Sequence, residues 1–109
     1  METFLDSTEL IDDGAALAKR LKRDGYLFVR GLFPRARVLE IHRRLLDKAA
    51  QGGWLDQASP VEQGIAEPSA ACKDPEAAYM QVFRGLWADE ELHRLRTHPS
   101  VLAVFERIF

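Results

Sequence analysis

Cysteine is almost absent from this chain. Cys72 is the single cysteine in 109 residues, so no disulfide can form within the chain and nothing indicates an oxidising compartment. Long apolar runs are absent too, since no stretch approaches the ~20 apolar residues that a membrane-spanning helix needs. Residues 1–6 are acidic and lack the apolar region of a secretory signal. We therefore expect a cytoplasmic protein with no membrane partner.

The chain also lacks an excess of basic charge. Lysine and arginine number 15 against 17 aspartates and glutamates, for a net charge of -2. Nucleic acid is therefore not expected as a partner, because phosphate binding usually leaves a clear basic surplus. The length of 109 residues allows one domain, or part of one, with a modest core. We treat residues 1–109 as a single helical region.

Motifs that carry catalysis or hold metals are missing as well. None of the histidines, His42, His93 and His98, begins the His-x-Asp or His-x-Glu pattern of a two-histidine, one-carboxylate iron site. Cys72 has no histidine near it in sequence. No Gly-x-Ser-x-Gly motif and no phosphate-binding glycine loop is present. We expect no catalytic residue, no metal ligand and no cofactor-binding residue in this chain.

Apolar residues recur with helical spacing over most of the sequence. Gly25 is expected to end the first helix, and Gly52 and Gly53 the second, because glycine adopts the left-handed conformation at little cost. The expected helices run from residue 8 or 12 to 24, from 34 to about 51, from 76 onward, from an Asp89 cap through 95, and over 101–109. Their expected buried faces are Leu10, Gly14, Leu17 and Leu21; Val38, Ile41, Leu45, Leu46 and Ala49; Tyr79, Val82 or Phe83, and Leu86; and Val101, Leu102, Phe105, Ile108 and Phe109.

One short strand is expected between the first two helices. Residues 26–29, with the sequence YLFV, are aromatic and branched, which favours a strand buried on both faces. A single strand is not stable in water, so its sheet partners are expected outside this chain. The last apolar stripe reaches Phe109 without a glycine cap or a polar tail, as expected for a segment of a larger domain.

The region from 52 to about 75 is expected to be an irregular but ordered loop. Prolines and glycines interrupt it too often for a long helix. A loop of this length is usually functional or packed on a larger body. Trp54, Leu55, Val61 and Ile65 are its expected apolar anchors.

Two groups of side chains are candidates for binding. Tyr79, Met80, Phe83 and Arg84 combine aromatic rings with a cation, and these residues are the candidate wall of a substrate pocket. Packing in the core is the favoured alternative for them. A basic set could bind a phosphate or an acidic partner, although two solvated helix faces explain it better. This set comprises Arg35, Arg37, Arg43 and Arg44, together with Lys19, Arg20, Lys22 and Arg23.

The segment DGYLFVRGLFP (residues 24–34) after an amphipathic helix is the most distinctive part of the sequence. Further segments are GWL (53–55), GIAEPS (64–69), FRGLW (83–87) and HPSVL (98–102). Together they resemble the N-terminal region of the phytanoyl-CoA dioxygenase family, over nearly the whole chain. The first segment is distinctive, whereas the helical parts are generic.

The resemblance implies an iron(II)- and 2-oxoglutarate-dependent oxygenase with a double-stranded β-helix, or jelly-roll, core buttressed by helices. It implies that this chain is mainly α, with one or two short strands, and forms the N-terminal helical portion of that fold. The family's His-x-Asp pair, distal histidine and basic 2-oxoglutarate ligand have no counterpart here. The chain alone is therefore expected to be inactive and to need the remainder of the domain, or a complementing chain. The alternative is a non-catalytic helical protein-interaction module that docks or self-associates.

Overall fold

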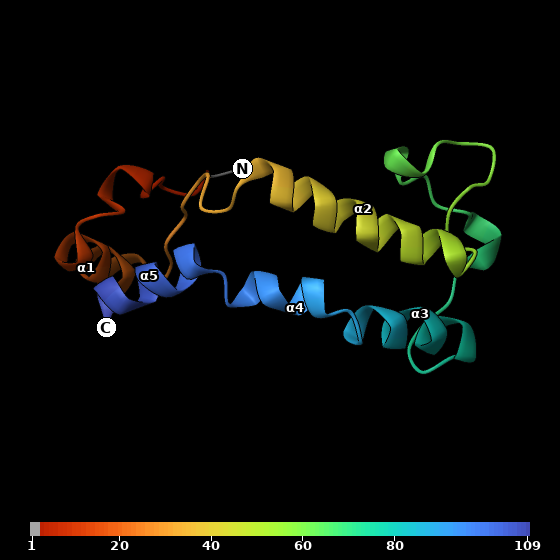
Figure 1. Ribbon diagram of the computed structural model, residues 1–109. Coiled ribbons are helices and arrows are strands. Elements are labelled where there is room, and N and C mark those ends of the chain that lie inside the picture. The colour runs from red at the N-terminus through yellow and green to blue at the C-terminus, as the bar shows by residue number, and fades with distance from the viewer. Residues whose placement is uncertain (1–2) are drawn as a thin grey trace. The chain divides into compact units, whose positions relative to one another are not determined.

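The computed structural model describes residues 3–109 and is mainly helical, as predicted (Figure 1). Its residues form two compact units, one containing the residues up to Arg35 together with Arg96–Phe109, and the other containing Ala36–Leu95. The α-helices are α1 (Gly14–Asp24), α2 (Arg35–Gln51), α3 (Ala77–Trp87), α4 (Glu90–Arg96) and α5 (Pro99–Ile108). Short 3-10 helices cover Thr8–Leu10, Val61–Gln63 and Pro68–Ala70.

The first unit is built on the packing of α1 against α5 (Figure 1). Asp13 caps α1 by accepting a hydrogen bond from the Ala16 amide, and Gly25 ends the helix with a φ of 78°. Leu17 on α1 is fully buried, and Val104 on α5 is buried as well. The helix ends at the predicted residue, but it begins at Gly14 and not at residue 8 or 12, because a separate 3-10 turn precedes it.

Residues 26–29 do not form the predicted strand. Among residues 3–109, their only β pairing is an isolated parallel bridge between Phe28 and Asp6. All four of these residues are half-buried, and none is buried on both faces. The ring of Phe4 packs on Tyr26 and Phe28, with centroid distances of 4.9 and 6.0 Å. The segment is extended, but the described residues supply no neighbouring strand long enough to pair with it.

The second unit contains α2, α3 and α4, with α2 running beside the other two helices (Figure 1). Ile41 on α2 and Val82 on α3 are its buried apolar residues. Gly52 lies so close to α3 that a β-carbon there would come within 2.2 Å of Val82 Cγ2. The glycine after α2 therefore ends the helix, as predicted, and also permits a close approach to α3.

The predicted buried faces are only partly correct. Leu17 and Ile41 are buried as expected, and of the alternatives Val82 and Phe83 it is Val82 that is buried, whereas Val104, the buried residue of α5, was left out of the predicted stripe. Several residues predicted to be buried are instead exposed, because the described chain places no element over them. These residues are Val38, Leu45, Ile65, Leu102, Phe105 and Phe109.

The loop after α2 is ordered, as predicted. An antiparallel bridge joins Leu55 to Ala66, and the Glu67 amide donates to the Trp54 carbonyl at 2.8 Å. Asp56 accepts hydrogen bonds from the Ser59 hydroxyl and the Ala58 amide, which close the first turn of the loop. Among residues 3–109, no helix has the length and apolar composition that crossing a bilayer requires.

Candidate functional site

A row of aromatic rings lies along α3 in the second unit. Tyr79, Phe83 and Trp87 are spaced four residues apart, so they share one face of the helix. Their ring centroids are 5.9 and 6.1 Å apart, and neighbouring rings are nearly parallel. The row continues onto the loop, where the Trp54 ring stacks on Tyr79 at 6.1 Å. At its other end the His93 ring meets Trp87 edge-on.

The aromatic row is more exposed at one end than at the other. Trp87 is 63% exposed and Phe83 is 40% exposed, whereas Tyr79 and Trp54 are half-buried. Isolated apolar side chains are common on protein surfaces, but stacked neighbouring rings form a continuous apolar face. The exposed part of this face, at Phe83 and Trp87, is open to contact with a flat or apolar group.

A groove of about 310 Å³, which we term the loop groove, opens at the buried end of the row. Trp54 and Tyr79 supply its aromatic walls, and the chain between Ala66 and Cys72 supplies the rest. The Trp54 Nε1 atom is buried and has no hydrogen-bond partner among the described residues. A buried indole N–H normally finds an acceptor, so this atom is an unsatisfied donor. The lining residues are Trp54, Ala66, Glu67, Pro68, Ala70, Ala71, Cys72 and Tyr79.

The structure brings together only two of the four residues predicted for a substrate pocket. Tyr79 and Phe83 stack on each other, and Tyr79 also lines the loop groove. Met80 and Arg84 each follow one of these residues directly, so they occupy the adjacent face of α3. Met80 is half-buried and Arg84 is exposed.

Sequence reasoning did not assign Trp87, Glu67 or Cys72 to this site. The spacing of Tyr79, Phe83 and Trp87 at every fourth residue was the available signal for the row. No local pattern identifies Glu67 or Cys72, because the fold of the loop alone brings them beside Tyr79.

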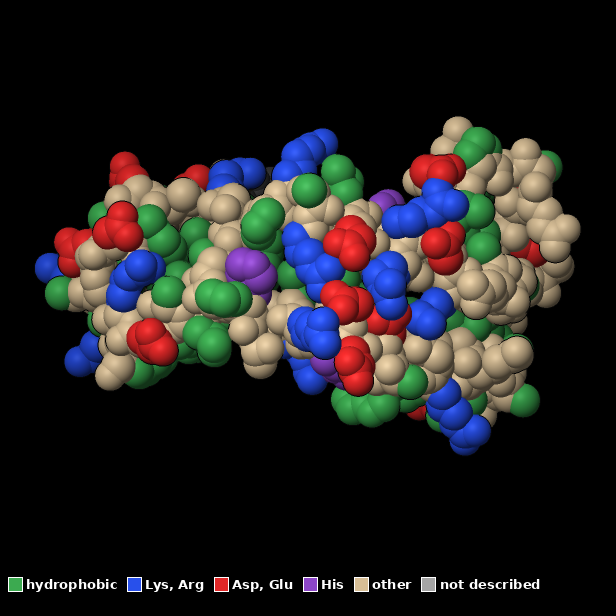
Figure 2. Space-filling model, viewed as in Figure 1, with side chains coloured by type: hydrophobic (Ala, Val, Ile, Leu, Met, Phe, Trp, Pro, Cys, Tyr) green, Lys and Arg blue, Asp and Glu red, His purple; other side chains and the backbone are tan. Residues whose placement is uncertain are grey.

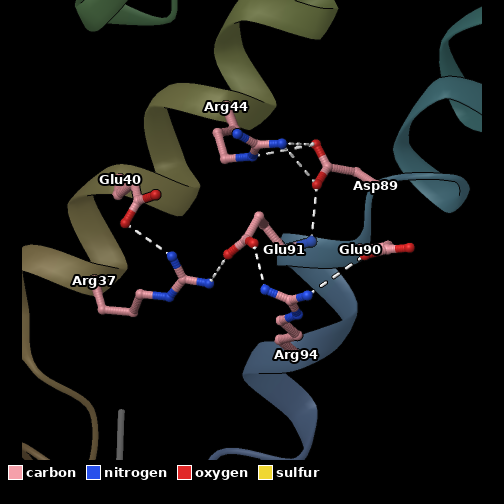
Figure 3. Close-up of polar contacts among 7 residues, drawn as sticks. All are labelled: Arg37, Glu40, Arg44, Asp89, Glu90, Glu91 and Arg94. Atoms are coloured by element: carbon pink, nitrogen blue, oxygen red, sulfur yellow. Dashed lines mark hydrogen bonds and ion pairs between the residues drawn. The ribbon is translucent and has the colours of Figure 1, made fainter.

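A second polar cluster links α2 to the start of α4 (Figure 3). The Asp89 carboxylate is 3% exposed and accepts hydrogen bonds from Arg44 Nη2 at 2.9 and 2.8 Å and from Arg44 Nε at 3.2 Å. It also accepts from the Glu91 amide at 3.0 Å, which makes Asp89 the cap of α4, as predicted. Burial raises the pKa of the Asp89 carboxyl, but the hydrogen bonds from Arg44 and the Glu91 amide outweigh it and hold the pKa below its ordinary value.

The remaining charges of this cluster alternate in sign. Arg37 binds Glu40 at 2.8 Å and also binds Glu91, while Arg94 binds Glu91 at 2.8 Å. The hydrogen bond from Arg37 lowers the pKa of Glu91, and it does so against the opposing effect of desolvation. Figure 2 shows the result as basic and acidic side chains interspersed over α2 and α4. We infer that the cluster sets the position of α4 against α2.

This pairing bears on the prediction that the arginines of α2 bind an anion. Arg37, Arg43 and Arg44 all have carboxylate partners within the second unit. Because an incoming phosphate would compete with these carboxylates, the interpretation as a solvated, internally paired face is favoured. The pairing leaves anion binding as the weaker interpretation.

The histidines have structural contacts of their own. His98 caps α5, since its Nδ1 accepts from the Ser100 amide at 3.2 Å, and its ring packs on Phe33 at 5.6 Å. His93 Nε2 lies at hydrogen-bond distance from the Trp87 carbonyl oxygen. Within residues 3–109, no three His, Cys, Asp or Glu side chains converge as a metal site requires. The residues present therefore do not fit an iron centre.

Comparison of the chain with protein-family models, with curated proteins and with solved structures finds no match.

Proposed function

We propose that this chain is the N-terminal scaffold segment of an iron(II)- and 2-oxoglutarate-dependent dioxygenase that resembles phytanoyl-CoA dioxygenase. In the complete enzyme, dioxygen would be the oxidant and iron would activate it; one oxygen atom would hydroxylate a small organic or acyl substrate, and the other would enter succinate as 2-oxoglutarate is decarboxylated. The proposal assigns no iron ligand and no catalytic residue to this chain. It includes a jelly-roll core, formed by the remainder of the oxygenase domain or by a complementing chain, and a cytoplasmic location.

The observation that carries the proposal is the extended segment between α1 and α2. Its sequence is the part of the chain most similar to the family, and its conformation suits a strand that joins a larger sheet. Phe28 uses its carbonyl oxygen to accept from the Ser7 amide at 2.7 Å, and the Arg30 amide donates to the Thr8 hydroxyl at 2.7 Å. Both contacts lie on the side of the segment that faces residues 6–8. The other side is the one that we propose pairs with the core sheet.

The apolar surface supports the same interpretation. The buried apolar residues are Leu17, Ile41, Val82 and Val104, whereas Trp87, Phe105 and Phe109 are more than half exposed. Such a surface is typical of a protein that buries part of its apolar area against another element. In the proposed enzyme, the Tyr79–Phe83 pair lies against the substrate and excludes water from it.

A second function is favoured by the aromatic row itself. A continuous face of Tyr79, Phe83 and Trp87 is also what a helical interaction module would present to a partner helix. In that case the chain docks a partner, or a second copy of itself, and has no catalytic role. The ion pairs of Arg37 and Arg44 would then serve to keep the aromatic face in place.

The solution state of the purified chain distinguishes the two functions. An autonomous module would be supported if light scattering shows a monodisperse monomer and thermal melting shows one cooperative transition. Aggregation of the chain alone, relieved by a second polypeptide that carries a His-x-Asp pair and a distal histidine, would support the scaffold segment. The assay for the complete enzyme is iron-dependent formation of succinate from 2-oxoglutarate.

A further inference from the structure

The loop groove has a chemical character that the proposed function does not use. The aromatic side chains of Trp54 and Tyr79 line it, and Glu67 is the single charged residue that lines it. No lysine, arginine or histidine is among the lining residues. An electron-rich aromatic surface beside one carboxylate is the arrangement that attracts a cation.

Glu67 is held in place and ionised. Its Oε1 atom accepts from the Ser69 hydroxyl at 2.6 Å and from the Ser69 amide at 3.0 Å. These hydrogen bonds, the hydroxyl one first, lower the pKa of Glu67 more than burial raises it, so the carboxylate is charged at neutral pH. Within residues 3–109, no cationic side chain forms a salt bridge with Glu67. Its charge is therefore not neutralised by the described part of the chain.

The apolar walls decide which kind of cation fits. Ala66, Pro68, Ala70 and Ala71 present methyl and methylene groups to the groove and offer no acceptor side chain. A primary ammonium has three N–H donors, and Glu67 is the single carboxylate among the lining side chains, so the groove offers it few charged acceptors. A quaternary ammonium carries methyl groups in place of those donors, and such groups are recognised by aromatic walls.

We propose that the loop groove is a binding site for a small organic cation of the quaternary ammonium type. The ammonium lies against the indole of Trp54, beside Tyr79, with Glu67 as its counter-ion. The site does not depend on the oxygenase proposal, because it requires neither iron nor a second chain.

The test uses the full chain with Trp87→Phe, which leaves Trp54 as the single tryptophan. Its fluorescence is titrated with choline and with 3,3-dimethylbutan-1-ol, a neutral compound of the same shape, at constant ionic strength. We expect a saturable response to choline, and binding of the neutral compound at least about fivefold weaker, because it lacks the cation–π attraction. Helicity measured by circular dichroism on the same samples verifies that the chain is folded.

Two matched variants test the counter-ion. Glu67→Gln keeps the shape of the side chain and an acceptor for Ser69, and it should weaken choline binding about three- to tenfold. Glu62→Gln removes a carboxylate from the same loop that binds Arg43 and does not line the groove, so it should leave choline binding unchanged. Any one of three results would overturn the proposal. These are equal affinities for choline and the neutral compound, an unchanged affinity for choline in Glu67→Gln, and no fluorescence response to choline in a sample whose circular dichroism shows a folded chain. None of these results bears on whether the chain is part of an oxygenase.

Discussion

Leu17 is the residue whose truncation most directly tests the packing of the first unit. It is 0% exposed and lies on α1, the helix that packs against α5. Leu17→Ala removes buried methyl groups and leaves a cavity, a change that costs about 2–5 kcal/mol in protein cores. Small domains are stable by only about 5–15 kcal/mol, so this loss is a large fraction of the stability available to the unit.

Amide hydrogen exchange measures this loss locally, without requiring one cooperative transition for the whole chain. A loss of 2 kcal/mol corresponds to a fall of about thirtyfold in the protection of amides that exchange by opening of α1 and α5. We therefore expect at least this fall in both helices of Leu17→Ala. The effect should reach α5 as well as α1, because the two helices pack against each other and each contains one buried apolar residue.

Phe105→Ala is the matched control. Phe105 is the larger side chain and belongs to α5, but it is 58% exposed. Its truncation should change protection by less than about threefold, since substitutions of exposed residues usually stay within about 0.5 kcal/mol. The reasoning would be refuted if Phe105→Ala reduced protection as much as Leu17→Ala. That result would show that Phe105 is covered in solution and that the described core is not the one that stabilises the unit.

Two further predictions follow from the contacts of each unit. Gly14→Ala should destabilise the first unit, because the added β-carbon would lie 2.2 Å from the Arg107 carbonyl oxygen. Gly85→Ala should instead stabilise α3 by up to about 1 kcal/mol, because its added β-carbon has nothing within 4 Å and alanine favours a helix more than glycine does. Denaturant titration should therefore show a lower free energy of unfolding for Gly14→Ala and a higher one for Gly85→Ala. The pKa of Asp89 is lower in the folded state than its ordinary value of 3.8. Its pairing with Arg44 therefore contributes its full stabilisation at pH values above 3.8, and this stabilisation is lost as the pH falls through the lower pKa of the folded state. Thermal melting between pH 7 and pH 2 should show this loss in the native chain and a smaller acid-dependent loss in Asp89→Asn; equal pH dependence of the two proteins would contradict the assignment.

The helices were largely predictable from the sequence because their end signals are local. Gly25 and Asp89 act where expected, since a left-handed glycine and a capping carboxylate need only neighbouring residues. The start of α1 was misplaced because Thr8 and Asp13 are both good caps, and sequence spacing does not reveal that a 3-10 turn separates them. Helix ends that one residue determines were therefore predicted better than the start of α1, for which several residues could serve as the cap.

The buried faces were less predictable because burial depends on what covers a helix. Val38 and Ile41 are three residues apart on α2, yet Ile41 is buried and Val38 is exposed. The periodic pattern identified the apolar stripe but could not show which part of it another element covers. The expected strand at residues 26–29 depends on its surroundings in the same way: among the described residues it forms a single isolated bridge, and the sheet partners expected for it lie outside this chain.

The candidate site combines a predictable part with an unpredictable one. Tyr79 and Phe83 follow from helical spacing, and the structure places their rings 5.9 Å apart. Glu67 reaches the same region only through the Leu55–Ala66 bridge and the turn after it, which no sequence period encodes. The four-residue spacing thus indicated an aromatic face, while the charge beside it became visible only in the fold.

We propose that this chain is a scaffold that needs an iron-bearing core from another part of the enzyme. The most direct measurement is iron-dependent conversion of 2-oxoglutarate to succinate. It compares the 109-residue chain alone with the chain combined with a polypeptide, encoded after Phe109 or in a neighbouring frame, that supplies His-x-Asp and a later histidine. We predict no succinate from the chain alone and turnover from the combination. Iron-dependent succinate formation by the chain alone, or an inactive combination, would contradict the account.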